Sequence, residues 1–397
     1  MPREQSEWNK SIERGIDTLL HHRPLTVSVD ISASVLQTSN LAESTQSTSN
    51  SLAASKAIHH ARERLNQTLV QGEDDEEINY APDPKVLDYI ANIERYSNHK
   101  LPDKLTPCHF SYLDWQKVCL AAQAAKSIHK MTPTSGDALF FPGSTFGTFK
   151  SFAVSKNTYS GAQYLIVAIR ATRTTWDWMV NLNAEPTEYT EFGNRFKCHR
   201  GFLLVAQNMK ASVEKSIMEH LSTLVGPTNV IFAGHSAGAA VAQLLFTFIR
   251  THPAADLVAN VLGPNVSQMD CITFGGPPTS FPPLPIPPSC LFLDFKNEGD
   301  PVTLAQPDYI ESLLQAYVLK PPRTSSVWAV PGPLYYSSGD QILLRDVAGE
   351  DSDEEHPAAF RVDHDETKSI IFGNPVRHSM SLYLKRVETI RDRFLDV

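Results

Sequence analysis

The sequence is poor in cysteine and has no long hydrophobic run, and both absences narrow the class of protein. Its 5 cysteines are odd in number and form no C-x-x-C pair, so they fit reduced thiols better than a disulfide framework. No stretch approaches the ~20 apolar residues of a membrane-spanning helix. The first residues also lack a basic segment followed by an apolar run. We therefore expect a cytoplasmic protein without a transmembrane segment, or a secreted one if the start codon is misassigned.

Positive charge is scarce as well, which argues against polyanionic partners. The chain has 35 Lys and Arg against 44 Asp and Glu, a formal net charge of −9 at pH 7. Acidic runs at residues 73–77 and 350–355 are typical of solvated loops. No basic patch with interleaved aromatic residues is present, so we expect no nucleic-acid partner and no strong attachment to anionic membranes.

Patterns of metal ligands are missing too. The histidine pairs at residues 21–22 and 59–60 have diverging side chains and no cysteine or carboxylate at ligand spacing. We therefore expect neither a metal site nor a cofactor.

The chain does contain a glycine-flanked serine between a strand-like and a helix-like segment. Residues 234–238 read G-H-S-A-G, after the apolar run 230–233 and before a helical run at 239–250. A serine on such a tight turn exposes its hydroxyl, and the glycines let the strand and the helix approach each other closely. We predict that Ser236 is a nucleophile; an ordinary turn serine is the alternative.

A serine hydroxyl is a weak nucleophile at neutral pH and needs a histidine base and a carboxylate that orients it. α/β-Hydrolases carry these groups in the order Ser, Asp or Glu, His, and Asp300 and His378 follow Ser236 in that order. Asp300 comes directly after a predicted strand at 291–295, where a sheet displays catalytic groups. Its Gly-Asp-Pro context also suits a simple turn. Asp294 lies inside the strand and is expected to be a buried or edge polar residue.

Other histidines and one thiol compete less well for these roles. His356 and His364 lie in the acidic stretch 350–366, which we interpret as a solvated loop. Cys198 adjoins His199, but neighbours on a strand point to opposite faces, so we do not expect a thiol nucleophile there.

Short motifs occur in a fixed order between residues 108 and 397. They are Ile169-Arg170-Ala171-Thr172, His199-Arg200-Gly201-Phe202, Gly234-His235-Ser236-Ala237-Gly238, Thr273-Phe274-Gly275-Gly276-Pro277, Asn297 to Val302 and His378-Ser379-Met380. In that order they are similar to F-R-G-[ST], H-x-G-F, G-H-S-x-G, T-F-G-x-P, N-x-x-D-P-V and H-S-M. The chain therefore resembles the class 3 lipases of filamentous-fungal type, which are α/β-hydrolases that act on acylglycerols and other esters.

The resemblance implies an α/β fold, the α/β-hydrolase fold, with a central, mostly parallel sheet flanked by helices. It also implies that Ser236, Asp300 and His378 form a catalytic triad. The amide and hydroxyl of Thr172 and the amide of Ala237 would form the oxyanion hole. Such donors stabilise the charge that develops in the transition state, and losing one typically costs roughly 10²–10³-fold in turnover.

Residues 174–182 resemble the family's lid helix. Polar residues recur there at helical spacing and leave a broad apolar surface. That surface consists of Trp176, Trp178, Met179, Val180 and Leu182. We interpret it as a lid that covers the serine in water and turns outward onto lipid, or as a helix packed permanently in the core.

The resemblance covers residues 108–397, which we predict to form a lipase-like α/β-hydrolase catalytic domain, and residues 1–107 are the predicted N-terminal extension. The extension is rich in Ser, Thr, Asn and Gln at 37–51 and offers little apolar surface to bury. We predict that it is partly disordered, with helices near residues 5–20, 55–70 and 84–96.

Helix-like and strand-like segments alternate in the catalytic domain, as a sheet covered by helices requires. We predict helices at residues 112–129, 239–250 and 380–394, and strands at 153–154, 164–169, 230–233, 271–274, 291–295 and 341–344. The stiff, proline-rich stretch 277–288 forms either an apolar wall beside the acyl site or a surface loop without substrate contact.

These observations predict a serine carboxylic-ester hydrolase, a lipase that cleaves acylglycerol esters through an acyl-enzyme and contacts lipid interfaces transiently. A feruloyl-type esterase and a phospholipase remain alternatives, because the elbow and the triad specify acyl transfer rather than the leaving group. A catalytically silent α/β-hydrolase scaffold that binds a protein partner is the alternative from another class.

Overall fold

The computed structural model describes residues 41–74, 82–132, 138–144, 148–171, 185–191, 194–250, 266–319, 326–348 and 354–394. The chain divides into two compact units, residues 1–51 and residues 52–397. The second unit contains the sheet and the helices that pack on it.

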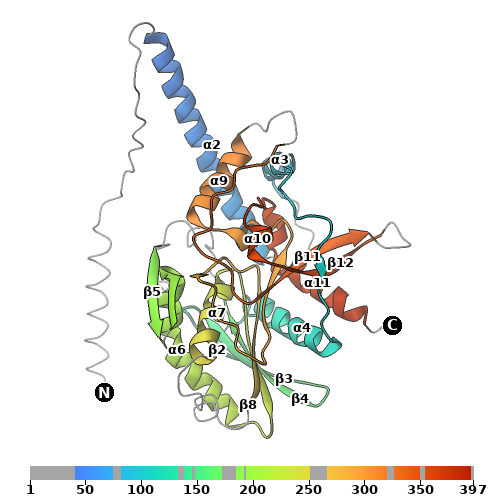
Figure 1. Ribbon diagram of the computed structural model, residues 1–397. Coiled ribbons are helices and arrows are strands. Elements are labelled where there is room, and N and C mark those ends of the chain that lie inside the picture. Colours follow the sequence, from blue (N-terminus) through green and yellow to red (C-terminus); the bar gives the residue numbers. More distant parts are fainter. Residues whose placement is uncertain are drawn as a thin grey trace, which may run out of the picture. The chain divides into compact units, whose positions relative to one another are not determined.

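A nine-stranded sheet forms the centre of this unit, with the strand order β1-β12-β11-β10-β8-β7-β4-β3-β2 (Figure 1). The strands are β1 (Thr106–Pro107), β2 (Ala138–Phe141), β3 (Phe152–Tyr159), β4 (Ala162–Ile169), β7 (Thr228–His235), β8 (Val266–Phe274), β10 (Phe292–Asn297), β11 (Asp340–Ala348) and β12 (Glu355–Val362). The inner strands β4, β7, β8, β10 and β11 pair in parallel. The outer pairs on both sides are antiparallel. The mostly parallel sheet and all of the predicted strands are confirmed.

The inner strands are continuous apolar runs because both of their faces are covered. In β7, Val230 and Phe232 belong to one hydrophobic cluster and Ile231 and Ala233 to another. This alternation follows from the two-residue period of a strand, which sends successive side chains to opposite faces. The serine that follows β7 is therefore anchored from both sides of the sheet.

Helices cover both faces of the sheet, as Figure 1 shows. α6 (Arg200–Leu221) and α7 (Ala237–Arg250) supply the first cluster, and α4 (Tyr112–Ser127) and α11 (Met380–Asp392) supply the second. α4 begins at a capping box, in which Ser111 accepts a hydrogen bond from the amide of Asp114 and the Asp114 carboxylate accepts one from the amide of Ser111. The helices predicted at residues 112–129, 239–250 and 380–394 are confirmed. The fourth helix, α6, was not predicted.

A third cluster joins the N-terminal region to the 3₁₀ turn η1 (Pro301–Leu304) and to α9 (Pro307–Val318). α2 (Leu41–Asp74) and α3 (Pro84–Ile93) contribute to it from the N-terminal region. Ala61, Leu65 and Leu69 of α2 are buried in this cluster and recur every four residues, so they form one stripe along the helix. The helices predicted near residues 55–70 and 84–96 are confirmed, and the first belongs to a longer helix. The helix predicted near 5–20 lies outside the described residues.

The interpretation of residues 350–366 as a solvated loop is wrong for the part that the structure describes. Glu355–Val362 form β12, which pairs with β11 along its full length. His364–Thr367 form the short helix α10, capped by a reciprocal pair of hydrogen bonds between Asp363 and Glu366. β12 stays partly exposed, which explains why a strand near the sheet edge tolerates acidic neighbours.

A small antiparallel sheet has the strand order β5-β6-β9. Its strands are β5 (Pro186–Glu191), β6 (Asn194–His199) and β9 (Ser280–Phe281). β9 lies within the proline-rich stretch, whose first residues, 277–280, are buried while Phe281 is 49% exposed. This stretch is thus partly packed and partly at the surface.

Candidate active site

Ser236 occupies the turn between β7 and α7 in a strained conformation. Its φ is +56°, a region that non-glycine residues rarely adopt. The turn is fixed by backbone hydrogen bonds: the amide of Ser236 donates to the carbonyl of Phe274 at 3.0 Å, and the carbonyl of Ser236 accepts from the amide of Ala239 at 3.0 Å. Strain held in place by surrounding structure is typical of functional turns.

The glycines of this turn are required by close contacts between backbones. A Cβ atom at Gly234 would lie 2.6 Å from the carbonyl carbon of Gly238. One at Gly238 would lie 2.4 Å from the carbonyl oxygen of Ile169. The motif therefore brings β7, α7 and the end of β4 together around the serine, as the sequence pattern predicts.

Asp300 and His378 form a buried pair. Nδ1 of His378 donates to Oδ2 of Asp300 at 2.9 Å, and the two side chains are 2% and 0% exposed. Asp300 also caps η1, because its Oδ1 accepts from the amide of Val302 at 2.9 Å. The turn-forming and the histidine-orienting interpretations of Asp300 are therefore compatible.

Tyr383 adds a further donor to this pair. Its hydroxyl donates to Oδ2 of Asp300 at 2.7 Å and accepts from the amide of Asn297 at 2.8 Å. Oδ2 thus receives two hydrogen bonds, and the carboxylate has a fixed orientation toward His378. Sequence reasoning missed Tyr383, because its place in the amphipathic helix α11 gives no sign of this long-range contact.

The end of β8 lies between the serine turn and the acid–histidine pair. Phe274 accepts the hydrogen bond from Ser236, and the next residue, Gly275, has φ +59°. A Cβ atom at Gly275 would lie 3.1 Å from Oδ2 of Asp300 and 3.1 Å from Nδ1 of His378. Backbone alone fits here, so the serine turn and the acid–histidine pair both lie at the end of β8.

Two side-chain atoms of this arrangement are buried and have no hydrogen-bond partner among the described residues. They are Oγ of Ser236 and Nε2 of His378. Burial of Ser236 is complete, at 0% exposure. An alcohol and an imidazole nitrogen that are not engaged elsewhere can each take part in proton transfer. No hydrogen bond joins the two atoms to each other in this structure.

His235, beside the serine, is hydrogen-bonded to the main chain of His378. Its Nε2 lies 2.8 Å from the carbonyl oxygen of His378, and the two rings are 4.5 Å apart between centroids. A carbonyl only accepts, so Nε2 of His235 carries the proton. Burial lowers the pKa of His235 well below its usual value, and the proximity of His378 and His129 lowers it further. His235 is therefore a neutral donor; the sequence motif contained it, but no role was predicted for it.

Asp294, the competing carboxylate, is a buried polar residue, as predicted. It is 0% exposed, accepts from the hydroxyl of Thr273 at 2.9 Å and lies 3.7 Å from Nζ of Lys296. Burial raises the pKa of Asp294 to about 6, although Lys296 opposes the shift. Within the described contacts no histidine pairs with Asp294, so its place in the fold does not match that of an orienting acid.

The predicted oxyanion and lid residues are only partly described. Ala237 is the first residue of α7 and is buried directly after Ser236. Thr172 and the predicted lid residues Trp176, Trp178, Met179, Val180 and Leu182 lie outside the described residues. The segment that leads to Thr172 passes the turn closely, because a Cβ atom at Gly238 would lie 3.1 Å from the amide nitrogen of Ala171.

The remaining candidates lie apart from this arrangement. Cys198 is buried, and burial raises the pKa of its thiol to about 12, which disfavours a reactive thiolate. His199 packs on Phe202 at 4.4 Å between ring centroids, and burial lowers its pKa to about 4. His364 contacts Tyr336 at 4.9 Å between ring centroids.

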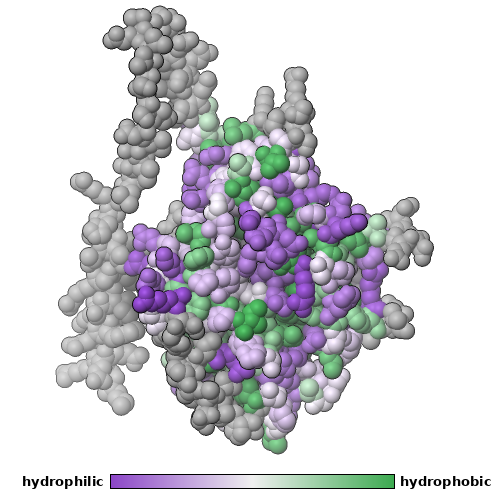
Figure 2. All heavy atoms as spheres, in the orientation of Figure 1, coloured by the Kyte–Doolittle hydropathy of each residue, from purple (hydrophilic) through white to green (hydrophobic). Residues whose placement is uncertain are grey.

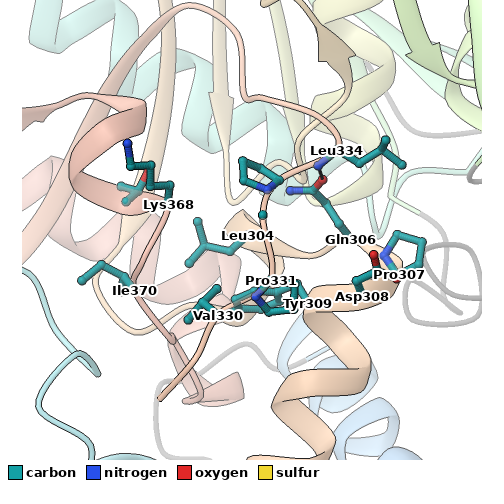
Figure 3. A pocket seen from close by; sticks show the side chains of 13 residues that line it. Leu304, Gln306, Pro307, Asp308, Tyr309, Val330, Pro331, Leu334, Lys368 and Ile370 are labelled. Carbon is teal, nitrogen blue, oxygen red and sulfur yellow. Dashed lines mark hydrogen bonds between the residues drawn. The ribbon is translucent and has the colours of Figure 1, made fainter. Parts of the chain in front are cut away.

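A cavity of about 60 Å³ lies between α9, the segment before β11 and the residues around α10 (Figure 3). Leu304, Gln306, Tyr309, Val330, Leu334 and Ile370 contribute to its walls. Ser236, Asp300 and His378 are not among the lining residues, so the cavity is separate from the candidate active site.

Hydrophilic residues cover the region over α10 in the face shown in Figure 2, with smaller hydrophobic areas between them. None of the helices described combines the length and the apolarity that a membrane crossing requires. In the part of the chain that the structure describes, histidine, cysteine and carboxylate side chains do not gather in groups of three or more suited to a metal ion.

The strand order, the parallel centre of the sheet and the serine turn after β7 define an α/β-hydrolase. Residues 166–282 match a family described as lipase (class 3), which confirms the resemblance over that part of the chain. The match contains the serine turn and ends before Asp300 and His378. No curated protein matches the chain.

Solved structures of fungal lipases resemble the chain at low sequence identity. A Rhizomucor miehei lipase propeptide complex has 13% identity and a TM-score of 0.42, and the match covers 73% of this chain and 82% of that one. A triacylglycerol lipase from Penicillium expansum has 12% identity and a TM-score of 0.39, with 68% and 89% covered. The nonglycosylated LIP2 lipase of Yarrowia lipolytica has 12% identity and a TM-score of 0.41, with 68% and 96% covered.

The strand order and the family match together support a carboxylic-ester hydrolase of the lipase type.

Proposed function

We propose that the chain hydrolyses carboxylic esters through Ser236, His378 and Asp300. The observation that carries this proposal is the buried 2.9 Å hydrogen bond between His378 and Asp300 at the strand end that also holds the Ser236 turn. An imidazole held by a carboxylate at Nδ1 presents Nε2 as the base, which is the arrangement that activates a serine hydroxyl.

The reaction follows from these positions. Nε2 of His378 takes the proton of Ser236 as Oγ attacks the ester carbonyl carbon, and the carbonyl oxygen becomes an oxyanion. The amide of Ala237, with Thr172 as its proposed partner, stabilises that oxyanion. The C–O bond to the alcohol breaks, His378 protonates the leaving alkoxide, and an acyl-enzyme remains. Water then attacks the acyl carbon and gives a proton to His378. The bond from the acyl carbon to Oγ breaks, His378 returns that proton to Ser236, and the acid leaves.

The tautomer of His378 is consistent with this cycle. Asp300 accepts a hydrogen bond from the Nδ1–H group of His378, so Nε2 carries no proton and its lone pair is available for Ser236. Tyr383 and the amide of Val302 neutralise part of the carboxylate charge and fix its direction. His235 holds the backbone of the same histidine. The base is thus oriented at its ring and at its main chain.

The proposed substrates are acylglycerols, on the strength of the family match at residues 166–282. We further propose that residues 174–182 form a lid that opens at a lipid interface, so that contact with lipid is transient. A panel of triolein, monoolein, phosphatidylcholine and methyl ferulate, each tested above and below its aggregation limit, separates a lipase from a phospholipase and a feruloyl-type esterase. Preference for a glyceride above its aggregation limit supports the lipase proposal.

The test of the triad uses soluble esters, which need no interface. We expect Ser236→Ala to reduce hydrolysis of p-nitrophenyl butyrate and octanoate by about 10³-fold or more, since the nucleophile is lost. Circular dichroism and thermal unfolding of the variant check that it is folded. Equal rates for the two proteins would remove Ser236 from the mechanism.

A fluorophosphonate probe distinguishes an enzyme from a silent scaffold. We expect covalent labelling of Ser236 in the native chain and none in Ser236→Ala. A folded chain that stays unlabelled, in buffer and in the presence of detergent or lipid droplets, would favour the scaffold.

A further inference from the structure

Two loops carry the acid and the base. The acid loop is residues 297–300, at the end of β10, and the histidine loop is residues 369–378, before α11. They are joined directly: the amide of Asn374 donates to the carbonyl of Gly299 at 2.9 Å, and Nδ2 of Asn297 donates to the carbonyl of Arg377 at 2.8 Å. The position of one loop therefore depends on the position of the other.

A segment of the predicted N-terminal extension packs behind both loops. It consists of α3 and the residues that follow it, residues 84–101, and we call it the brace. Ile93, the last residue of α3, is 2% exposed and lies against Gly373 of the histidine loop. A Cβ atom at Gly373 would lie 2.6 Å from Cγ1 of Ile93, so the glycine is needed for this close approach.

Asn98 connects the brace to the histidine loop through its side chain and its main chain. Its Nδ2 donates to the carbonyl of Ser369 at 2.6 Å, and its carbonyl accepts from the amide of Ile371 at 2.9 Å. The same side chain donates to the carbonyl of Trp328 at 3.0 Å and accepts from the amide of Trp328 at 2.9 Å. The side-chain amide of Asn98 thus links the brace to the segments that contain Trp328 and Ser369.

The end of the brace is bound to the acid loop. The amide of Leu101 donates to Oε1 of Glu298 at 2.9 Å, two residues before Asp300. Arg345 donates to both carboxylate oxygens of Glu298 and, from Nη2, to the carbonyl of Leu101 at 3.0 Å. The carboxylate of Glu298 is therefore paired with Arg345 and hydrogen-bonded to Leu101. These contacts fix the acid loop to β11 and to the brace.

Space remains between the brace and the loops. A cavity of about 170 Å³ lies there, with Ile90, Ile93 and Glu94 of the brace facing Gly299, Gly373 and Asn374 of the loops. The contacts named above therefore act beside those of α9, whose Tyr309 and Tyr317 hydroxyls are hydrogen-bonded to Phe372 and Gly373 of the histidine loop. A displacement of about 1 Å at a catalytic group can cost on the order of 10²-fold in rate.

We propose that residues 84–101 are a positioning element for the reaction, with Ile93 and Asn98 setting the mutual placement of Asp300 and His378. This rests on the proposed function, because it assigns a role in the geometry of that triad. The brace does not touch Ser236 and supplies no reacting group. It acts by holding the two loops, and it makes part of the N-terminal extension necessary for catalysis.

The decisive experiment uses the full chain and adds one methyl group. We expect Gly373→Ala to lower kcat for p-nitrophenyl butyrate by about 10-fold or more with little change in KM, because the Cβ displaces the histidine loop. Ile93→Ala in the same chain removes Cγ1 and Cγ2, and the double variant should recover most of kcat. Gly332→Ala is the matched control, since a Cβ there meets no atom within 4 Å.

Asn98→Ala provides an independent arm if Gly373→Ala does not fold. It should lower kcat by about 10-fold with KM nearly unchanged, because the hydrogen bond from Nδ2 of Asn98 to the carbonyl of Ser369 is lost. Asn208→Ala is its control, because Nδ2 of Asn208 also donates to a backbone carbonyl, that of Thr148, but far from the loops in sequence and outside the brace. Thermal unfolding identifies the temperature range in which every variant is folded.

The outcomes separate this proposal from the proposed function. Wild-type kcat in folded Gly373→Ala and Asn98→Ala, or a loss that Ile93→Ala fails to restore, overturns the role of the brace while Ser236 remains the nucleophile. Undiminished hydrolysis by Ser236→Ala instead overturns the triad itself. Recovery in the double variant supports positioning, because a general loss of stability would deepen when a second buried side chain is truncated.

Discussion

The serine turn, residues 234–238, and the acid and histidine loops, residues 297–300 and 369–378, are built in opposite ways. The turn depends on contacts between neighbouring backbones, with glycines where a Cβ would lie 2.6 Å or 2.4 Å from the next segment. The loops depend on side chains far apart in the sequence, such as Asp300 with His378 and Asn98 with Ser369. Local sterics therefore place Ser236, and long-range hydrogen bonds place Asp300 and His378, its proposed partners.

The largest loss of activity is expected from adding a side-chain atom to the serine turn. Gly238→Ala puts a Cβ 2.4 Å from the carbonyl oxygen of Ile169, a backbone atom that cannot rotate away. We expect fluorophosphonate labelling and ester hydrolysis to fall by about 10³-fold, because the turn and the adjoining end of β4 are forced apart. The labelling rate measures this directly. Labelling at the native rate would show that the turn tolerates what its geometry excludes.

The two aspartates around β10 provide a second contrast. Asp294 interacts with buried Lys296 and Thr273, whereas Asp300 faces His378. We expect Asp294→Asn to lower the free energy of unfolding by about 4 kcal/mol, because Lys296 loses its buried partner, while kcat at a temperature where the variant is folded stays near native. Urea unfolding and initial rates measure the two quantities. A large loss of kcat with native stability would move Asp294 into the catalytic group.

The serine turn and most of the sheet could be predicted from the sequence because their signals are local. An apolar run such as 230–233, followed by a glycine-flanked serine and small residues, already specifies strand, turn and helix. β12 was missed because its neighbourhood is acidic and its face is partly exposed. Composition alone does not reveal pairing with a strand such as β11.

The supports of the acid and histidine loops could not be predicted, because their partners come from distant parts of the chain. Tyr383 reaches Asp300 from α11, and His235 reaches the carbonyl of His378 from β7. Asn98 belongs to a region whose composition indicated partial disorder. The roles predicted for Thr172 and the lid residues remain predictions, as does the cytoplasmic compartment.

A buried histidine outside both regions gives the third test, through pH. The pKa of His199 is lowered by burial from 6.5 to about 4, so the native state binds fewer protons than the unfolded state between these values. The lowered pKa of His199 makes a contribution to the free energy of unfolding that is fully present above pH 6.5 and is lost as the pH falls toward 4. We expect about 3 kcal/mol at most from this residue.

His199→Phe isolates that contribution, since phenylalanine can occupy the contact with Phe202. The difference in the free energy of unfolding between the two proteins should change with pH from 6.5 to about 4 and be constant above 6.5. Asp294, with a raised pKa of about 6, acts in the opposite direction but is common to both proteins and cancels. A difference independent of pH would show that His199 is not held neutral by burial.

The smallest effect is expected from removing one donor to the acid. Tyr383→Phe takes away the hydroxyl that donates to Asp300 and accepts from the amide of Asn297. We expect kcat to fall by about 10-fold and the free energy of unfolding to fall by about 1–2 kcal/mol. Tyr112→Phe is the control, because it removes a hydroxyl that is hydrogen-bonded to Tyr159 away from both loops. Equal kcat in the two variants would mean that the acid needs no second donor.

The most direct test of the central claim, that Asp300 and His378 serve Ser236 as one unit, is a double-mutant cycle on kcat/KM. Asp300→Asn, His378→Ala and the double variant are compared with the native chain on p-nitrophenyl butyrate. Residues that act as a unit are strongly non-additive. The double variant should therefore be about as slow as His378→Ala alone. Losses that multiply, with the double variant slower than either single variant by the full factor of the other, would contradict the account.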